Sequence, residues 1–99
     1  MVQRDDLELW LNDFLSAQSV QDYAPNGLQI EGRERIERIA TAVSVTQEVI
    51  DAAVEDGADA LVVHHGMFWK NEDPVLRRHR RRRVRSILQA DLNLFAYHL

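Results

Sequence analysis

The first hydrophobic pattern along the chain predicts an amphipathic helix. Apolar residues recur at intervals of three and four, which places on one helical face Leu7, Trp10, Leu11, Phe14 and Leu15. Asp5 or Asp6 is expected to cap the first turn, where a carboxylate also favours the positive end of the helix dipole. Polar Gln18 and Ser19 are expected to end the helix. We expect the apolar stripe to pack in the core.

The middle of the chain alternates between strand and helix patterns. Small and β-branched residues predict a strand over residues 39–45, and a short apolar run predicts a second, buried strand over residues 60–63. Thr46 and Gly57 stand where the N-cap and the C-terminal stop of a helix belong. The helix between them has a stripe of Val49, Ile50, Ala53 and Val54. A strand, a helix and a strand in this order predict a right-handed crossover between parallel strands.

Two outer strands complete the predicted sheet. A tight loop over residues 22–27, which contains Pro, Asn and Gly, leads into an alternating strand over residues 28–31. The chain ends in a further apolar strand over residues 93–99. These elements predict an α/β fold in which helices pack on a largely parallel sheet. Such a sheet needs covering on both faces, and the sequence stops at its last apolar strand with no helix after it. We therefore expect residues 1–99 to be a single, truncated domain.

The last predicted helix follows an irregular loop at residues 67–72. Asp73 and Pro74 form an N-cap followed by proline at the first helical position, so we expect the helix to cover about residues 75–90. Its inner face is expected to consist of Leu76, Val84, Ile87 and Leu88.

Charge is distributed unevenly, because seven arginines lie between Arg77 and Arg85 with no acid among them. The rest of the chain then holds five basic and 16 acidic residues, a formal charge of −11 against −4 for the whole chain. A charge run on a helix is typically a solvated face, and His79 within it is expected to be exposed. The alternative is that the run attracts phosphate-bearing ligands. No nucleic-acid-binding module surrounds it, so we expect no sequence-specific nucleic-acid binding.

Two adjacent histidines, His64 and His65, follow the apolar run of the central strand and precede Gly66. The carboxyl edge of a parallel sheet is where ligands collect. Neighbouring strand residues point to opposite faces, so two such rings would not readily chelate one ion. With Gly66 freeing the backbone to turn, both rings can lean over the edge and serve two nearby ions. The alternative is a pair that caps the strand by hydrogen bonds.

The final strand also ends in a histidine, His98, which reaches the same edge if this strand is parallel to the central one. The chain has no cysteine, so any metal must use His, Asp, Glu or water as ligands, which suits zinc, iron, manganese or nickel alike. Phe68 and Trp69 follow the histidine pair. They are expected either to line a pocket for a planar ligand or to cover the sheet edge.

Composition and missing motifs narrow the function classes. A length of 99 residues with 45% hydrophobic content is ordinary for one globular domain. No apolar run approaches the roughly 18 residues of a membrane helix, and the start lacks a signal-peptide pattern. We therefore expect a cytoplasmic protein without a membrane partner. The chain contains no glycine-rich phosphate loop, GxSxG elbow or HExxH helix, so no catalytic residue is assigned.

Three blocks of sequence resemble one known family. They are residues 22–32 (DYAPNGLQIEG), residues 57–70, with GADALVVHHG followed by FWK, and residues 93–99 (NLFAYHL). In order and spacing they are similar to the amino-terminal part of the Nif-three-like proteins. These are also named GTP cyclohydrolase I type II homologues, or the dinuclear metal-centre family. The double-histidine block and the NGLQ block are specific together, whereas either alone is weak evidence.

The resemblance implies an α/β fold, incomplete here, with two divalent metal ions at the sheet edge. It assigns His64 and His65 as ligands and places near the site His98, Phe68, Trp69 and Lys70. An aspartate ligand would fall beyond Leu99, and a further histidine and glutamate would come from the far carboxyl-terminal part. This chain alone is therefore expected to bind metal weakly and to be inactive.

For a full-length protein the resemblance implies a ring-like homo-oligomer and a metal-dependent hydrolase. Its substrate would be nucleotide-like, and water activated by the metal ions would open a purine ring. Two other hypotheses stay open at this point. One is a non-catalytic metal-binding or oligomeric scaffold protein, and the other is a truncated chain without activity.

Overall fold

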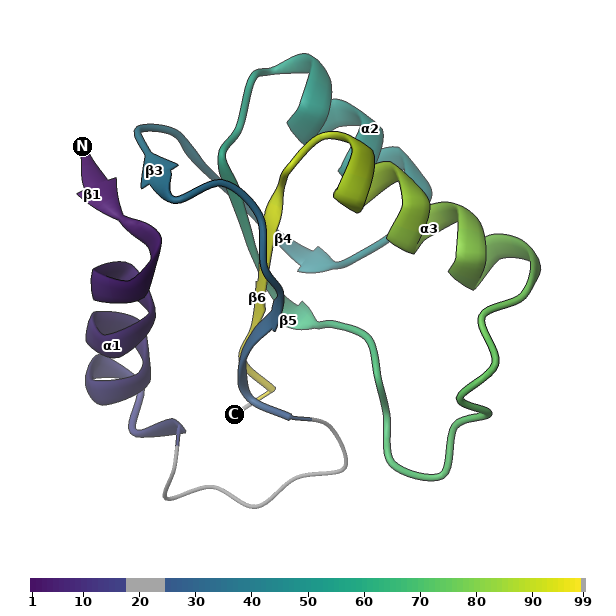
Figure 1. Ribbon diagram of the computed structural model, residues 1–99. Coiled ribbons are helices and arrows are strands. Elements are labelled where there is room, and N and C mark those ends of the chain that lie inside the picture. The colour runs from purple at the N-terminus through teal and green to yellow at the C-terminus, as the bar shows by residue number, and fades with distance from the viewer. Residues whose placement is uncertain (18–24, 99) are drawn as a thin grey trace.

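A computed structural model describes residues 1–17 and 25–98, in which three helices lie against a four-stranded sheet (Figure 1). The helices are α1 (Arg4–Phe14), α2 (Gln47–Glu55) and α3 (Arg78–Gln89). The sheet contains β2 (Gly27–Ile30), β4 (Ile39–Ser44), β5 (Ala60–His65) and β6 (Asn93–Ala96). A separate antiparallel pair joins β1 (Val2–Gln3) to β3 (Arg35–Ile36). The predicted α/β class is confirmed.

The four-stranded sheet has the order β2-β6-β5-β4. Both β4 and β6 run parallel to β5, whereas β2 is antiparallel to β6. The predicted parallel crossover from β4 through α2 to β5 is therefore present. Val63 of β5 lies beside Ala96 of β6, so the carboxyl ends of these two central strands meet at one edge of the sheet.

Helices cover both faces of this sheet, with α2 and α3 on one side and α1 on the other (Figure 1). The core under α2 and α3 includes the fully buried side chains Ile50, Leu61, Ile87 and Leu94. The core on the α1 side is smaller and includes Ile36, Ala60, Phe95 and Tyr97. Within the described residues, no helix is both long and apolar enough to cross a membrane.

The capping residues around α2 behave as predicted. The Thr46 hydroxyl accepts a hydrogen bond from the backbone N–H of Val49 at 3.1 Å. Gly57 follows the helix with φ of +77°, a left-handed conformation that costs glycine little. The predicted apolar stripe holds at Ile50 and Ala53, but Val54 is exposed.

The prediction for the first helix is wrong in part. Leu7, Leu11 and Leu15 pack against the smaller core, whereas Trp10 and Phe14 are 58% and 69% exposed. These two rings stack on each other, with centroids 4.9 Å apart. The edge of the stripe formed by Leu7, Leu11 and Leu15 therefore packs on the core, and the edge formed by Trp10 and Phe14 faces solvent.

The first helix begins earlier than predicted, at Arg4, and its N-cap residue Gln3 makes no side-chain capping hydrogen bond. Asp5 and Asp6 therefore do not cap the helix but lie in its first turn. The buried Arg4 guanidinium donates to the carbonyl of Gly32 at 2.9 Å, which ties the helix start to the chain after β2. Helix α1 ends at Phe14, while the predicted stop at residues 18–19 and the first half of the predicted loop over residues 22–27 lie outside the described residues.

The last helix starts three residues later than predicted, at Arg78. The Asp73 side chain accepts from the N–H of Val75 at 3.0 Å in a local turn, and Arg80 donates to the carbonyls of Asp73 and Val75 at 2.6 and 3.1 Å. The backbone at Arg77 is extended, with φ of −128° and ψ of 151°, so the helix begins only after this residue. Of the predicted inner face, Ile87 is buried and Val84 packs on the core, but Leu76 and Leu88 are exposed.

Candidate metal centre

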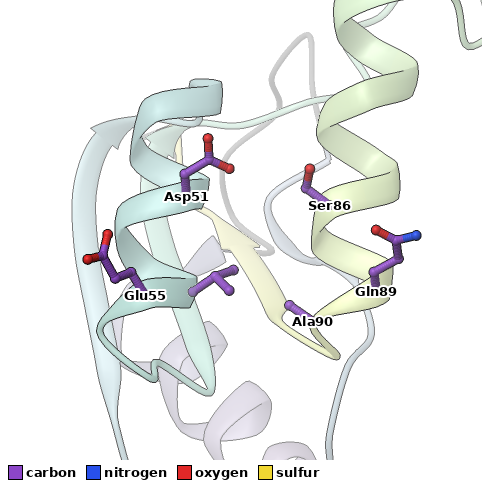
Figure 2. A pocket seen from close by; sticks show the side chains of 6 residues that line it. Asp51, Glu55, Ser86, Gln89 and Ala90 are labelled. Carbon is purple, nitrogen blue, oxygen red and sulfur yellow. The ribbon is translucent and has the colours of Figure 1, made fainter.

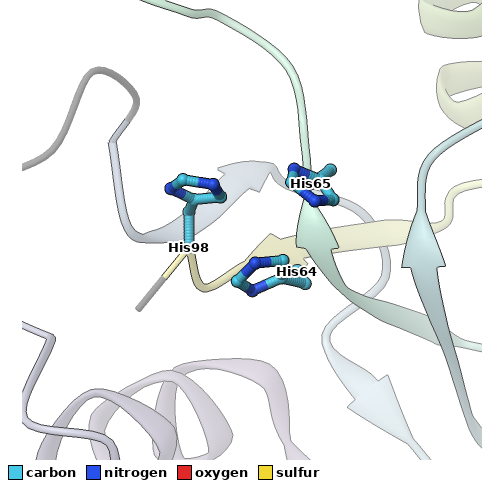
Figure 3. Close-up of side chains that lie close together, drawn as sticks. All are labelled: His64, His65 and His98. Atoms are coloured by element: carbon cyan, nitrogen blue, oxygen red, sulfur yellow. The ribbon is translucent and has the colours of Figure 1, made fainter.

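Three histidines converge at the carboxyl edge of the sheet (Figure 3). His64 and His65 are the last residues of β5, and His98 lies two residues beyond β6. Their ring centroids are 4.4 Å apart for His64 and His65, 4.7 Å for His64 and His98, and 5.0 Å for His65 and His98. One nitrogen from each ring lies within 4.8 Å of the others. The structure therefore brings together the two predicted ligands and the histidine predicted to lie near them.

The parallel pairing of β5 and β6 explains this convergence. Pairing continues one residue past β6, where the N–H of Tyr97 donates to the carbonyl of Val63 at 2.9 Å. The next residue of each chain segment is then a histidine, His64 on one side and His98 on the other. Two histidines far apart in sequence meet because their strands are neighbours in register.

Gly66 has a different role from the one predicted. It is absent from the glycines with positive φ, which are Gly27 and Gly57 in the described residues. A Cβ at Gly66 would instead collide with the Cβ of Ala96 and with the side-chain oxygen of Gln29. Glycine is required here because neighbouring segments approach the backbone closely, rather than because the chain makes a left-handed turn.

The orientation of His64 follows from one hydrogen bond. Its Nδ1 lies 3.1 Å from the carbonyl oxygen of Tyr97. A carbonyl only accepts, so Nδ1 is the donor in this hydrogen bond, and Nε2 is the ring nitrogen left for a metal ion when the ring is neutral. A ring N–H donated to a backbone carbonyl is the usual arrangement of a metal-bound histidine, because it fixes both the tautomer and the ring direction.

The donor set fits a divalent transition metal. Imidazole nitrogens bind zinc at about 2.0–2.1 Å, so two nitrogens on one ion lie at most about 4.2 Å apart. The ring nitrogens, which lie within 4.8 Å of one another, are close to that spacing. Three imidazole nitrogens could therefore contribute to a site for such an ion.

The loop after the histidines contributes one aromatic neighbour. The Trp69 ring lies 5.1 Å from that of His98 and 6.3 Å from that of His65, measured between centroids. Phe68 has φ of +63° and packs against the core under α2 and α3. Lys70 is exposed. Trp69 thus lies beside the histidines and Phe68 covers the core, while the expectation that the loop lines a pocket stays a prediction.

Sequence reasoning missed two amide side chains that support this edge. Asn26 accepts a hydrogen bond from the backbone N–H of His98 at 2.7 Å. Gln29 accepts from the N–H of Met67 at 2.7 Å and donates to the carbonyl of the same residue at 2.9 Å. Both belong to the NGLQ block, whose specificity was the available signal, but turn chemistry alone explained that block as a loop entering a strand.

The arginines of α3 are mostly solvated. Arg80 pairs with Glu72 at 2.5 Å. The exposed members of the run, which form no ion pair with any other described residue, are Arg77, Arg78, Arg81, Arg82 and Arg85. His79 is exposed, as expected.

A groove of about 410 Å³ lies between α2 and α3, away from the histidines (Figure 2). Asp51 and Glu55 line one wall, Ser86 and Gln89 the other, and Val54 and Ala90 complete the lining. None of the residues predicted to form the site lines this groove.

Comparison with known proteins places the chain in a family. The family model described as Duf34/NIF3 (NGG1p interacting factor 3) matches residues 2–99. A GTP cyclohydrolase 1 type 2 homolog from Vibrio cholerae is 54% identical over 93 residues, which make up 94% of this chain and 37% of the relative. A protein of the same name from Escherichia coli K12 is 46% identical over 98 residues, covering 99% of this chain and 40% of the relative.

Solved structures agree with these matches. A protein named ybgI, described as of unknown function, superposes with a TM-score of 0.96 at 45% identity, over 98% of this chain and 39% of that one. TTHA1606 from Thermus thermophilus superposes with a TM-score of 0.93 at 36% identity, over 99% and 40% of the two chains. The chain thus spans about 40% of the length of these proteins.

Proposed function

This chain belongs to the Duf34/NIF3 family, and from that premise we propose that it is a divalent-metal-binding segment of a GTP cyclohydrolase 1 type 2 homologue. His64 and His65 hold the metal, and His98 lies close enough to assist. The observation that carries the proposal is the convergence of three imidazole nitrogens within 4.8 Å at a sheet edge. An α/β sheet collects its ligands at that edge.

In a protein of family length, we further propose a metal-dependent hydrolase with a nucleotide-like substrate. The printed name of the relatives supports this class. A divalent ion, or a pair of them, would lower the pKa of water and polarise the atom under attack. In such a protein the histidines of this chain would hold the metal ions, and Trp69 would border the substrate. The electric field of the α3 arginines would attract the phosphates of the substrate.

Metal titration of point variants tests the binding proposal. We expect calorimetry with zinc to show binding by the wild-type chain and at least about tenfold weaker binding by His64→Ala and His65→Ala, because each loses one ligand. His79→Ala is the matched control, since His79 is an exposed histidine on α3, and it should bind like wild type. Unchanged affinity in both ligand variants removes the metal proposal.

A second experiment separates an enzyme from a scaffold. The chain is joined to the carboxyl-terminal part of the Vibrio cholerae relative, and formate release from GTP is followed with zinc, iron, manganese and nickel in turn. Release that depends on His64 and His65 supports the hydrolase. Metal binding without release, in a chimaera that light scattering shows to be an oligomer, would favour the non-catalytic scaffold.

A further inference from the structure

We propose that one short segment, Asn26–Gln29, positions both histidine-bearing parts of the chain and thereby sets the metal affinity of the centre. We name the side chains of Asn26 and Gln29 the amide clamp. This inference rests on the proposed metal centre, and it assigns positioning residues rather than ligands. Both amides form their hydrogen bonds with backbone groups and not with the histidine rings.

Gln29 holds the segment that follows the histidine pair. Its side-chain oxygen accepts from the N–H of Met67 at 2.7 Å, and its nitrogen donates to the carbonyl of Met67 at 2.9 Å and to that of Pro25 at 3.0 Å. Both backbone groups of Met67 are therefore bound by one side chain. Since Met67 is two residues after His65, this pair of bonds fixes where the chain goes as it leaves the metal edge.

Asn26 holds the other histidine-bearing segment. Its side-chain oxygen accepts from the backbone N–H of His98 at 2.7 Å. Gly27, with φ of +125°, separates the two amides, and this conformation is one that other residues rarely adopt. The segment can therefore aim one amide toward the end of β6 and the other toward the end of β5.

The strand itself is irregular at the position that the clamp requires. Leu28 lies opposite Phe95 and Ile30 lies opposite Leu94, so Gln29 is an extra residue in β2. A bulge of this kind redirects a side chain and is common beside functional sites. On the facing segment, Gly66 has no Cβ, and a Cβ there would collide with the Gln29 amide. The bulge and the glycine together make the contact between Gln29 and Met67 feasible.

Side chains that orient ligands without touching the metal contribute strongly to affinity. Loss of such a partner typically weakens metal binding or activity by roughly 10–100-fold. If Gln29 had a purely structural role, its substitution would lower the stability of the fold without weakening metal binding selectively. The chain offers a matched comparison in Gln47, whose side chain donates to Asp51 at 2.9 Å and to Ser86 at 3.0 Å rather than to a histidine-bearing segment.

The test compares Gln29→Met, Asn26→Ala and Gln47→Met with wild type in the same chain. Cobalt binding is followed by calorimetry and by the visible absorption of the bound ion, and folding is followed by thermal unfolding. We expect Gln29→Met to bind cobalt at least roughly tenfold more weakly than wild type, with an altered absorption spectrum. The loss of cobalt affinity in Asn26→Ala should be smaller. Gln47→Met should lower the thermal midpoint but leave cobalt affinity within about twofold of wild type, because neither of its partners, Asp51 and Ser86, belongs to a histidine-bearing segment. Wild-type affinity and spectrum in Gln29→Met would overturn the proposal.

A metal-free measurement separates failure of the clamp from failure of the metal centre. In wild type without metal, the amide protons of Met67 and His98 should be protected from hydrogen exchange. Each should lose protection in the variant that lacks its own partner, together with shifts in the histidine ring resonances. If wild type binds no cobalt, the metal proposal fails. This measurement still shows whether the amide clamp positions the two histidine-bearing segments. Unchanged protection and ring resonances in both variants would refute it.

Discussion

The polar side chains at the two ends of the central strands β5 and β6 differ in how they are arranged and hydrogen-bonded. At the amino ends, Asp59 and Asn93 are buried and saturated with hydrogen bonds inside the chain. At the carboxyl ends, His64, His65 and His98 converge with their rings toward one another. The same pair of parallel strands thus holds a structural polar cluster at one end and a candidate binding site at the other.

Asn93 is the centre of the structural end. It is fully buried, and its amide donates to the carbonyls of Arg33 at 2.8 Å and Asp59 at 3.0 Å while accepting from the N–H of Gly32 at 2.7 Å. One side chain therefore satisfies three backbone groups of two separate segments. Buried polar groups are tolerated when they are paired in this way, and they are costly when they are not.

Asp59 completes that end. Its carboxylate accepts from the N–H groups of Glu37 and Arg38 at 2.8 and 3.0 Å and pairs with the Arg33 guanidinium at 2.7 Å. Both carboxylate oxygens are occupied by groups of this chain. Internal saturation therefore marks the polar residues that stabilise the fold, whereas convergence of imidazole nitrogens marks the candidate site.

The largest expected effect would come from breaking the structural end. Asn93→Ala leaves the N–H of Gly32 and the carbonyls of Arg33 and Asp59 without their partner. We expect the free energy of unfolding to fall by about 3 kcal/mol in urea denaturation. Gln89→Ala, on the exposed side of α3, is the control and should change it by no more than about 0.5 kcal/mol. A loss below about 1 kcal/mol for Asn93→Ala would contradict the structural role.

A second, smaller effect concerns acid stability. Burial alone would raise the pKa of the Asp59 carboxyl, but the hydrogen bonds from Glu37, Arg38 and Arg33 outweigh it and hold the pKa below its usual value of 3.8. A depressed folded-state pKa stabilises the protein above the unfolded pKa of about 3.9, and this stabilisation is lost as the pH falls through the folded-state pKa.

Asp59→Asn tests this stabilisation. We expect it to cost about 2 kcal/mol near neutral pH, since it removes charge-assisted hydrogen bonds. It should also flatten the decline of unfolding free energy below about pH 4. The measurement is urea denaturation at a series of pH values. An identical acid profile in wild type and variant would show that another carboxyl is responsible.

The smallest expected effect on stability concerns the hydroxyl of Tyr97, a structural group close to the histidines. Tyr97 precedes His98, yet its hydroxyl donates to the side-chain oxygen of Asn12 at 2.7 Å on the α1 side. Burial, with a contribution from Glu8, raises the pKa of Tyr97 to about 12, so the hydroxyl keeps its proton at neutral pH. This contribution to stability is complete below about pH 10 and is lost as the pH rises toward 12.

We expect Tyr97→Phe to lower the free energy of unfolding by about 1 kcal/mol, the usual value for one hydrogen bond. Zinc affinity should be unchanged, because the carbonyl of Tyr97 rather than its hydroxyl contacts His64. Chemical denaturation and calorimetry on the same variant supply both numbers. A loss of zinc affinity without a loss of stability would place the hydroxyl in the binding site. It would also contradict the separation between structural and binding residues drawn above.

Local patterns were sufficient for a definite part of this protein. The alternation of strand and helix patterns predicted the parallel crossover, and Thr46 and Gly57 were assigned correctly because capping depends on a few adjacent residues. The histidine pair was located at a strand end for the same reason. Placing His98 beside it required only the further assumption that the last strand is parallel to the central one, which the structure confirms.

What tertiary structure decided involves contacts between distant residues. The stripe on α1 was visible in the sequence, but only packing determined that Leu11 is covered while Trp10 faces solvent. Helix α3 starts only at Arg78, after a turn whose carbonyls accept from the Arg80 side chain. The amide clamp joins Gln29 to Met67 and Asn26 to His98, pairs separated by 38 and 72 residues. Hydrophobic period and turn chemistry act over a few residues, so they place the histidines on their strands but not the amides that hold them.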